Sequence, residues 1–245
     1  MSWGKPGSKR DLRPADFAAA RRIQDRLRTR VRLDGLRSPV RLVAGADAAF
    51  LEDLAVGAAC LLTFPALEPV SDKQAVVEAP LPYRPGYLSF REGYVLAEAI
   101  LALPERPDLV LIDGQGIAHP KRLGLASFLG VILGLPTVGC AKSRLIGEHE
   151  DPPPQRGAWT VMRDKGEAVG AALRTRAGVR PVFVSPGHLT DLEQAVEFVL
   201  ACGGGFRIPE PLRRADRLSK AFKRDIQAAG RGRSSASRRS RCPVS

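Results

Sequence analysis

The chain has 245 residues, of which 44% are hydrophobic and 26% are charged, and its formal net charge is +12. A chain of this length and composition buries a sizeable core, so collagen-like, coiled-coil and wholly disordered proteins are excluded. The positive charge lies at the two ends, because residues 1–41 carry 12 basic and 4 acidic groups and residues 207–245 carry 12 and 3. Basic ends favour a polyanionic partner such as nucleic acid, and solubilising tails are the alternative.

The first third of the chain predicts a basic arm, a helix and an antiparallel sheet. Residues 1–14 have the composition of a flexible basic arm. Apolar residues then recur at helical spacing, at Phe17, Ala20, Ile23, Leu27 and Val31. Three apolar runs with short connections predict strands joined as hairpins. These runs cover residues 40–50, 54–64 and 74–79.

The rest of the chain alternates helical and buried-strand patterns. Helices are expected over residues 88–103, 123–133 and 190–201, and strands over 109–113, 137–141, 161–173 and 181–185. In the last helix, Thr190 is the expected N-cap, with Glu193 completing a capping box. Gly, Ser and Arg dominate residues 229–245, which predicts a disordered basic tail. The order of elements fits one α/β domain over residues 15–228, with a mixed central sheet flanked by helices.

The cysteines and the hydropathy of the sequence indicate the cellular location of the protein and whether it contacts a membrane. The four cysteines stand far apart, so the sequence has no CxxC motif, and no secretory signal is present. We therefore expect a reducing, cytoplasmic location. Residues 123–141 carry no charge, but four glycines and Pro136 interrupt them. A helix followed by a buried strand explains this stretch better than a membrane span, so no membrane contact is expected.

Three carboxylates on separate predicted elements form a candidate metal site. Asp47 lies inside an apolar strand, where an unpaired carboxylate is costly. Asp113 ends a buried strand, where sites in α/β folds commonly form, and Glu92 lies near the start of a helix. Hard oxygen ligands favour Mg²⁺ or Mn²⁺, which beside a phosphate polarises the phosphoryl oxygen and activates water. Spacing alone leaves open that Glu92 is a helix-terminal charge and Asp113 a turn former.

Five motifs in series resemble the endonuclease V family. They are VAGADAAF, PYRPGYLSFRE, LIDGQGIAHPKRLGLASFLG, PTVGCAKSRLIG and VSPGH, and the match covers about residues 39–216. The resemblance implies a ribonuclease-H-like fold, with residues 15–228 as the catalytic domain. It implies a Mg²⁺-dependent DNA repair endonuclease, with Mn²⁺ able to substitute. The implied substrate is DNA containing deoxyinosine, and the implied reaction is hydrolysis of the second phosphodiester bond on its 3′ side.

The resemblance also implies catalytic roles for individual residues. Asp47 and Asp113 match direct metal ligands, whereas Glu92 acts more through water. Asp216, in the run RIPEPLRRAD, matches a late motif that supplies a His or Asp to the same cluster. Lys142 matches an active-site lysine, whose ammonium holds the attacking water or offsets charge on the phosphoryl group.

One histidine and one turn matched by the same motifs have an alternative interpretation. His119 matches a catalytic histidine beside the scissile bond, as a phosphate or water contact, and a surface-loop histidine is the alternative. Residues 185–188 are expected to form a strand-to-helix turn whose backbone amides contact DNA. A plain turn is the alternative for these residues.

A second group of matched residues is expected to recognise the damaged base. Tyr83 and Pro85 match the PYxPG loop, whose tyrosine acts as a wedge when the base leaves the stack. Arg84 departs from the usually apolar family residue, and an arginine there contacts phosphate or stacks on a base. Further positions match the inosine pocket, namely Gly86, Leu88, Gly114, Gly116, Gly124 and Leu125.

Two other functions stay open at this point. The sequence does not distinguish DNA from RNA, so an inosine-specific endoribonuclease acting on inosine-containing RNA is one alternative. A non-catalytic nucleic-acid-binding module is the other. The presence of Asp47, Glu92, Asp113 and Lys142 together argues against it. We expect the protein to be a monomer.

Overall fold

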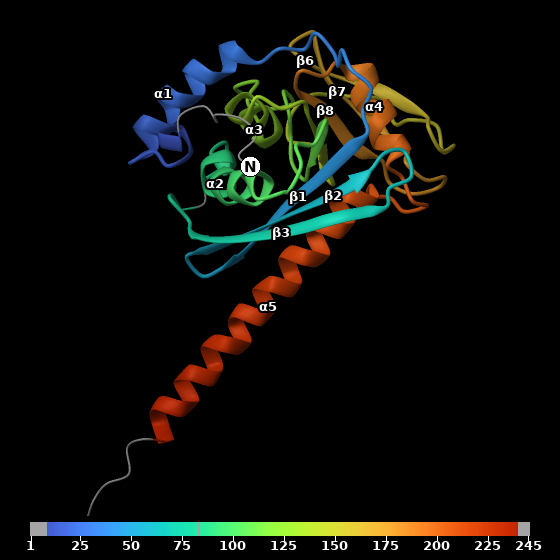
Figure 1. Ribbon diagram of the computed structural model, residues 1–245. Coiled ribbons are helices and arrows are strands. Elements are labelled where there is room, and N and C mark those ends of the chain that lie inside the picture. Colours follow the sequence, from blue (N-terminus) through green and yellow to red (C-terminus); the bar gives the residue numbers. More distant parts are fainter. Residues whose placement is uncertain (1–8, 83, 240–245) are drawn as a thin grey trace, which may run out of the picture.

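The computed structural model describes residues 9–82 and 84–239, with side chains described over 11–82 and 84–229. Within these residues the strands form one mixed sheet of eight, in the order β3-β2-β1-β4-β5-β8-β7-β6 (Figure 1). The strands are β1 Leu42–Leu51, β2 Leu54–Thr63, β3 Pro69–Glu78, β4 Leu109–Ile112, β5 Thr137–Ala141, β6 Trp159–Asp164, β7 Glu167–Leu173 and β8 Val182–His188. The predicted mixed central sheet is confirmed.

Strand pairing follows the sequence pattern. β1, β2 and β3 are joined as antiparallel hairpins, as the short connections predict. β1, β4 and β5 are parallel, and β4 and β5 are buried along their whole length, which explains their continuous apolar sequence. β8, β7 and β6 complete the sheet in antiparallel pairing.

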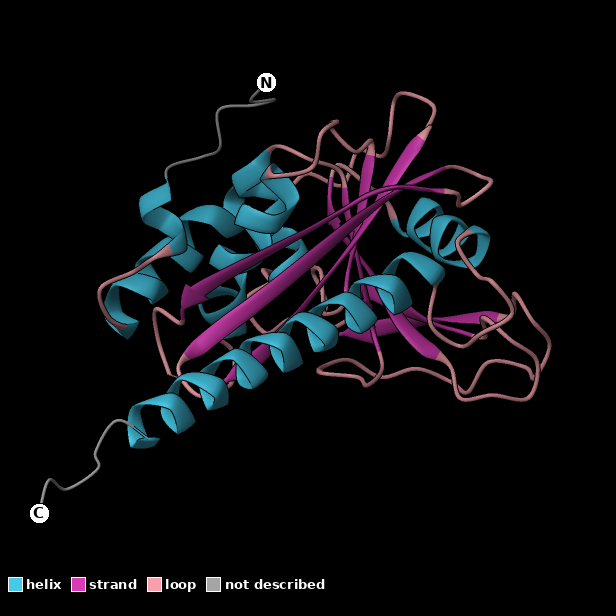
Figure 2. Ribbon diagram, turned by 60° about the horizontal axis from the view of Figure 1, so that its bottom comes forward, coloured by secondary structure: helices cyan, strands magenta, loops and turns pink. Residues whose placement is uncertain are grey.

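Helices cover both faces of the sheet and enclose two apolar cores. α1 (Phe17–Leu27), α2 (Leu88–Leu101) and α3 (Leu125–Leu133) pack on one face, and α4 (Leu192–Ala201) and α5 (Glu210–Arg239) pack on the other. Figures 1 and 2 show α5 lying across β1 and β2 and extending well beyond the sheet. Short 3-10 helices span Lys9–Leu12 and Arg28–Arg30.

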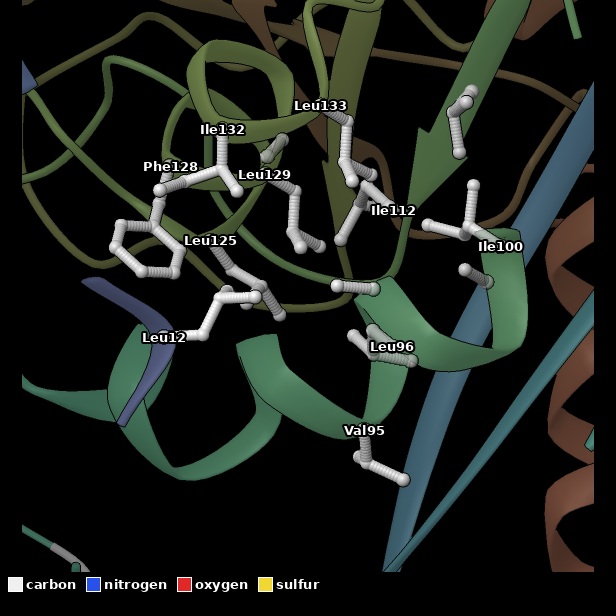
Figure 3. Packing of buried hydrophobic residues seen from close by; sticks show 14 of the residues in the cluster. Leu12, Val95, Leu96, Ile100, Ile112, Leu125, Phe128, Leu129, Ile132 and Leu133 are labelled. Atoms are coloured by element: carbon white, nitrogen blue, oxygen red, sulfur yellow. The ribbon is translucent and has the colours of Figure 1, made fainter. Parts of the chain in front are cut away.

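The structure changes the description of both ends of the chain. Leu12, placed in the expected flexible arm, is completely buried and lies among side chains of α2 and α3 (Figure 3). The sequence pattern did not predict α5, which runs on to Arg239, past the expected start of the disordered tail at residue 229. Residues 1–8 and 240–245 lie outside the described residues, and the division into arm, domain and tail stays a prediction.

Two local predictions around β8 and α4 are wrong. α4 is capped by Asp191, whose side chain accepts a hydrogen bond from the Gln194 amide at 2.8 Å. The Thr190 hydroxyl instead donates to the Thr137 carbonyl at 2.9 Å, so it ties the end of β8 to β5. Residues 185–188 are the end of β8 rather than a turn, because they pair with β5.

No helix within the described part of the chain is long and apolar enough to cross a membrane. Residues 123–141 form α3 and β5 with their connections, as expected from the glycines and the proline in this stretch.

α5 approaches β1 at a glycine. A Cβ atom on Gly45 would lie 2.2 Å from the Pro211 carbonyl oxygen, much closer than real Cβ contacts. On β2, Cys60 pairs with Gly45, and its thiol donates to the same carbonyl at 3.2 Å. The first turn of α5 therefore rests directly on the backbone of β1, and only glycine fits beneath it.

We expect Gly45→Ala to destabilise the protein by about 1–3 kcal/mol, because the added methyl group overpacks the contact with α5. Urea unfolding at pH 7 measures this loss. Gly204→Ala is the matched control, since its Cβ would have Glu210 Cβ as its nearest neighbour at 4.0 Å. Equal stability of the two variants would contradict the close approach at Gly45.

Candidate active site

The parallel pairing of β1 and β4 brings two of the predicted metal ligands side by side. Ala46 pairs with Ile112, and the Asp113 amide donates to the Ala46 carbonyl at 3.2 Å. Asp47 and Asp113 are the next residues on the two strands, so they lie next to each other across the ladder. The polar end of two apolar strands thus places two carboxylates at one point of the sheet.

α5 completes this carboxylate cluster from the other face. The Ser219 hydroxyl donates to Asp47 Oδ2 at 2.7 Å and lies 3.1 Å from the carbonyl oxygen of Asp216. Ser219 is completely buried, and it lies one helical turn after Asp216. Ser219 was not predicted from the sequence. Its spacing from Asp216 would have placed the two residues on the same side of a helix only if α5 had been predicted.

Lys142 supplies a positive charge to the cluster. It directly follows β5, and its ammonium donates to Asp113 Oδ2 at 2.6 Å and lies 4.0 Å from Asp216 Oδ1. Partial burial alone would lower the pKa of Lys142, but the hydrogen bond and charge of Asp113 outweigh burial and raise it. The Arg207 guanidinium donates to the Lys142 carbonyl at 2.8 Å, which holds the backbone of this residue in place.

Two carboxyl groups of the cluster hold their protons more tightly than usual. Burial raises the pKa of Glu92 to about 8, and the neighbouring charges of Asp47 and Asp113 add to the rise. Burial and the charges of Asp113 and Asp216 raise the pKa of Asp47 to about 6, against the hydrogen bond from Ser219. These shifts place Glu92 in the same electrostatic environment as the strand carboxylates, and they show that the cluster favours an added positive charge.

The carboxylate oxygens of this cluster are the kind of ligand that a hard divalent cation with few protein ligands uses. Within the described residues, no three His, Cys, Asp or Glu side chains are grouped closely enough to enclose a metal ion. Mg²⁺ characteristically uses one or two carboxylates and completes its octahedron with waters and substrate phosphates. Two adjacent aspartates with a third carboxylate nearby match that chemistry.

A second feature, called here the base cavity, is a hollow of about 120 Å³. Its walls come from the PYRPG loop, the β4–α3 connection, the first turns of α2 and α3, and the loop after β5. The residues are Pro85, Gly86, Leu88, Ser89, Gln115, His119, Gly124, Leu125 and Leu145. Five were predicted as substrate-binding residues, whereas Ser89, Gln115 and Leu145 were not singled out although they lie in the matched motifs. A larger hollow of about 960 Å³ beside the β6–β7 hairpin contains none of the predicted site residues.

His119 belongs to the wall of the base cavity. Its Nδ1 accepts a hydrogen bond from the Lys121 amide at 3.1 Å, so the proton of the neutral ring is on Nε2. Burial lowers the pKa of His119 to about 4, against a hydrogen bond with the Gly86 carbonyl. The same carbonyl accepts a bond from Gln24 Nε2 at 2.7 Å. His119 is therefore uncharged near pH 7, and with Gln24 of α1 it holds the PYRPG loop at Gly86.

Glycines shape the β4–α3 connection behind the cavity. A Cβ atom on Gly116 would lie 2.0 Å from the Pro186 carbonyl oxygen, and one on Gly124 would lie 2.4 Å from the Gln115 carbonyl oxygen. Ser185 Oγ accepts a hydrogen bond from the Gly116 amide at 2.7 Å. Gly114 and Gly116 do not line the cavity themselves. Together with Ser185, they determine the backbone path of the β4–α3 connection, whose residues Gln115, His119 and Gly124 line the cavity.

The PYRPG loop is described only in part. Tyr83 lies outside the described residues. Arg84 is exposed, and its guanidinium carbon lies 4.9 Å from the ring centre of Phe17 and 5.6 Å from that of Tyr87. The arginine that departs from the family pattern thus stacks on two aromatic rings of its own chain.

Comparisons with known proteins identify the family of this chain. The family model of endonuclease V matches residues 25–217. The endonuclease V of Geotalea uraniireducens (strain Rf4) is 52% identical over 213 residues, which cover 87% of this chain and 91% of that protein. The endonuclease V of Roseiflexus sp. (strain RS-1) is 50% identical over 206 residues, covering 84% and 93%.

Solved structures give the same result. The crystal structure of Streptomyces avermitilis endonuclease V has a TM-score of 0.84 and 44% identity, covering 88% of this chain and 96% of that chain. Ciona intestinalis endonuclease V, in complex with a 24mer DNA containing an inosine followed by a ribo-adenosine, has a TM-score of 0.74 and 29% identity, covering 86% and 98%. The expected ribonuclease-H-like fold is confirmed. The matched motifs, the strand order and these relatives lead to one conclusion: the chain belongs to the endonuclease V family and is a nuclease.

Proposed function

We propose that the protein is a Mg²⁺-dependent DNA repair endonuclease that recognises deoxyinosine and hydrolyses the second phosphodiester bond on its 3′ side. The observation that carries this proposal is the combination of two sites. Asp47, Asp113 and Lys142 form a charged cluster at the end of the sheet, and a separate base-sized cavity lies beside it on the same β4–α3 and β5 loops. A DNA partner is supported by the Ciona relative, which was solved with inosine-containing DNA.

The cluster supplies the groups that phosphodiester hydrolysis needs. Asp47 and Asp113 would hold the Mg²⁺ or Mn²⁺, which when bound neutralises a phosphoryl oxygen and lowers the pKa of a water. Glu92 would act through water; burial and the neighbouring carboxylates raise its pKa to about 8, and the charge of a bound cation would lower that pKa and favour the carboxylate form. The Lys142 ammonium offsets negative charge on the phosphoryl group, and Ser219 and Arg207 keep their partners in position. Asp216 adds a carboxylate that holds Lys220 at 2.8 Å.

The base cavity supports recognition of a base that has left the helix. Its volume of about 120 Å³ is well below that of pockets for drug-sized ligands, so it suits a single heterocycle rather than a nucleotide. Tyr83 would fill the gap left in the stack. His119 is uncharged near pH 7 and hydrogen-bonds Gly86 in the wall of this cavity, and its expected contact with a phosphate or a water stays a prediction.

Inosine-containing RNA is a second candidate substrate. The observation in its favour is that the nucleotide after inosine in the Ciona complex is a ribo-adenosine. The cytoplasmic location and the monomeric state expected from the sequence stay predictions.

Cleavage of end-labelled duplexes that carry one deoxyinosine tests the proposal. We expect cleavage in millimolar Mg²⁺ and none in chelator, at the second bond 3′ to the lesion. Asp113→Asn should lower the cleavage rate about 1,000-fold or more, because metal stabilisation of the transition state amounts to several kcal/mol. Binding of the deoxyinosine strand should persist, because the base cavity stays intact.

Asp53→Asn is the matched control, since Asp53 is an exposed carboxylate in the β1–β2 turn. It should cleave like the wild type. Full cleavage by Asp113→Asn, or cleavage in the presence of chelator, would overturn the metal assignment. An RNA strand with one inosine, tested in parallel, decides between the two candidate substrates.

The raised pKa of Glu92 predicts a pH-dependent effect on stability in metal-free protein. The folded protein keeps the Glu92 proton up to about pH 8, whereas the unfolded chain loses it near the ordinary value of 4.5. Stability is therefore lost as the pH rises through this interval. Glu92→Gln, which never ionises, should match the wild type at pH 5 and melt higher at pH 9, on the order of 5–10 °C.

Thermal unfolding in chelator at pH 5, 7 and 9 measures this difference. Glu105→Gln is the control, because Glu105 is exposed in the loop after α2 and should show no pH-dependent difference. A Glu92→Gln melting temperature that tracks the wild type at every pH would show that Glu92 ionises freely.

The basic C-terminal end predicts non-specific affinity for DNA. Residues 229–245 contain Arg231, Arg233, Arg238, Arg239 and Arg241, and α5 extends beyond the sheet as far as Arg239 (Figure 1). A chain ending at residue 228 should bind plain and lesion duplexes more weakly. The slope of log affinity against log salt should become shallower by about 0.9 for each phosphate that the protein no longer neutralises.

Cleavage position and metal requirement should be unchanged in the truncated protein. A full-length variant with these five arginines replaced by glutamine separates charge from length and should reproduce the shallower slope. Identical slopes for all three proteins would mean that the segment does not contact phosphate.

A further inference from the structure

Basic side chains follow one side of α1, where this helix meets the β4–α3 connection. Arg21, Asp25 and Arg28 recur at helical spacing along α1 and its C-cap, and all three are at least partly exposed. Asp25 Oδ1 accepts a hydrogen bond from Lys121 Nζ at 3.1 Å and lies 3.9 Å from Arg28 Nε. The pKa of this carboxyl is lowered by that hydrogen bond and by the positive charges of Lys121, Arg28 and Arg21. Three cations therefore surround one carboxylate, which leaves this side of α1 with a net positive charge.

A fourth cation extends the row towards the PYRPG loop. Arg84 stacks on the ring of Phe17, the first residue of α1, with its guanidinium carbon 4.9 Å from the ring centre. Phe17 lies one helical turn before Arg21, so both lie on the same side of the helix. We call Arg21, Arg28, Arg84 and Lys121 the basic seam. From Arg21 to Arg28 the helix rises about 10 Å, a length over which one DNA strand carries about three phosphates.

The basic seam is joined to the base cavity at two points. Gln24 of α1 donates from Nε2 to the carbonyl of Gly86, at 2.7 Å, and Gly86 lines the cavity. The Lys121 amide donates to Nδ1 of His119, which lines the cavity as well, at 3.1 Å. The seam therefore adjoins the two walls of the cavity that Gly86 and His119 form. Because the cavity suits a heterocycle alone, a base that enters it leaves its sugar and phosphates outside, close to these walls.

Cations held in fixed positions suit a phosphate backbone. Lys121 is held by its hydrogen bond to Asp25, and Arg84 is held by its stacking on Phe17. Such side chains lose less rotational freedom on binding than unrestrained lysines and arginines do. Neither contact neutralises the seam as a whole, so it keeps the charge with which to attract a polyanion.

We propose that the basic seam binds the phosphate backbone of the nucleic-acid strand next to the base that occupies the cavity. The proposal rests on the function proposed above. These contacts are independent of sequence, so they position the strand while the cavity reads the base. The basic seam is a different surface from the basic C-terminal end, because α1 and α5 pack on opposite faces of the sheet.

The salt dependence of binding in chelator tests the proposal. A triple variant, Arg21→Gln, Arg28→Gln and Lys121→Gln, removes three cations of the seam. It leaves Arg84 in place, because a change in the PYRPG loop would alter base recognition directly. For a duplex with one deoxyinosine, the slope of log affinity against log salt should become shallower by about 0.9 for each lost contact, or about 2–3 in all.

The matched control carries the same change of net charge at a distant place. It combines Arg37→Gln, Arg41→Gln and Arg106→Gln, which are exposed arginines in the segments before β1 and β4. The carboxylate cluster lies towards the opposite ends of these strands. The control should therefore keep the wild-type slope, and a slope that is equally shallow in both triple variants would overturn the inference.

Uncharged methylphosphonates in place of single phosphates locate the contact. A phosphate that the seam binds should cost the wild type about twofold to fivefold in affinity when it is neutralised, and it should cost the triple variant less. If no such phosphate exists within about five nucleotides of the deoxyinosine, the wild type alone overturns the inference, whether or not the variant folds. Those results leave the proposed function intact. A wild type that binds deoxyinosine and undamaged duplexes equally, and cuts neither in Mg²⁺, would instead overturn the proposed function.

Discussion

Charge repulsion among carboxylates at one end of the sheet is the constraint on which the site depends. The β1–β4 ladder forces Asp47 beside Asp113, and α2 adds Glu92 in surroundings poor in solvent. Lys142 is bound directly to this group as a counter-charge, through Asp113. Such an arrangement costs folding energy unless protons or a cation compensate it. The fold therefore creates a place where added positive charge would be stabilising, as the raised pKa values of Asp47 and Glu92 indicate.

The attachment of α5 explains how the last carboxylate group is positioned. Gly45 admits the Pro211 carbonyl against β1, and the Cys60 thiol holds it there. The next turns of α5 then bring Asp216 and Ser219 over Asp47. The same helix continues outward as a basic segment. One element thus links the carboxylate cluster at the end of the sheet to the positively charged end of the chain.

The sequence predicted those parts that depend on short-range pattern. The strands, the helices α1 to α4 and the carboxylates on β1, α2 and β4 follow from hydrophobic periodicity and from polar residues at strand ends. The sequence pattern did not predict α5, because its apolar positions are few among many arginines. Ser219 lies on this helix and was therefore not predicted either. Thr190 was mistaken for a cap because Asp191 offers the same chemistry one residue later.

Two neighbouring loops join chemistry to recognition. The connection after β4 carries Asp113 and then Gln115, and the loop after β5 carries Lys142 and then Ser143. Lys142 binds Asp113, and the Ser143 carbonyl binds Gln115, so the loops are tied together twice within two residues. The Gln115 tie is partly buried and the Lys142 tie is an exposed ion pair, and together they hold the base cavity at a set offset from the charged cluster. A nuclease that reads one base and cuts at a set distance from it needs such a rigid offset. Under the proposed function, the geometry of these two loops would set the distance between the bound base and the bond that is cut.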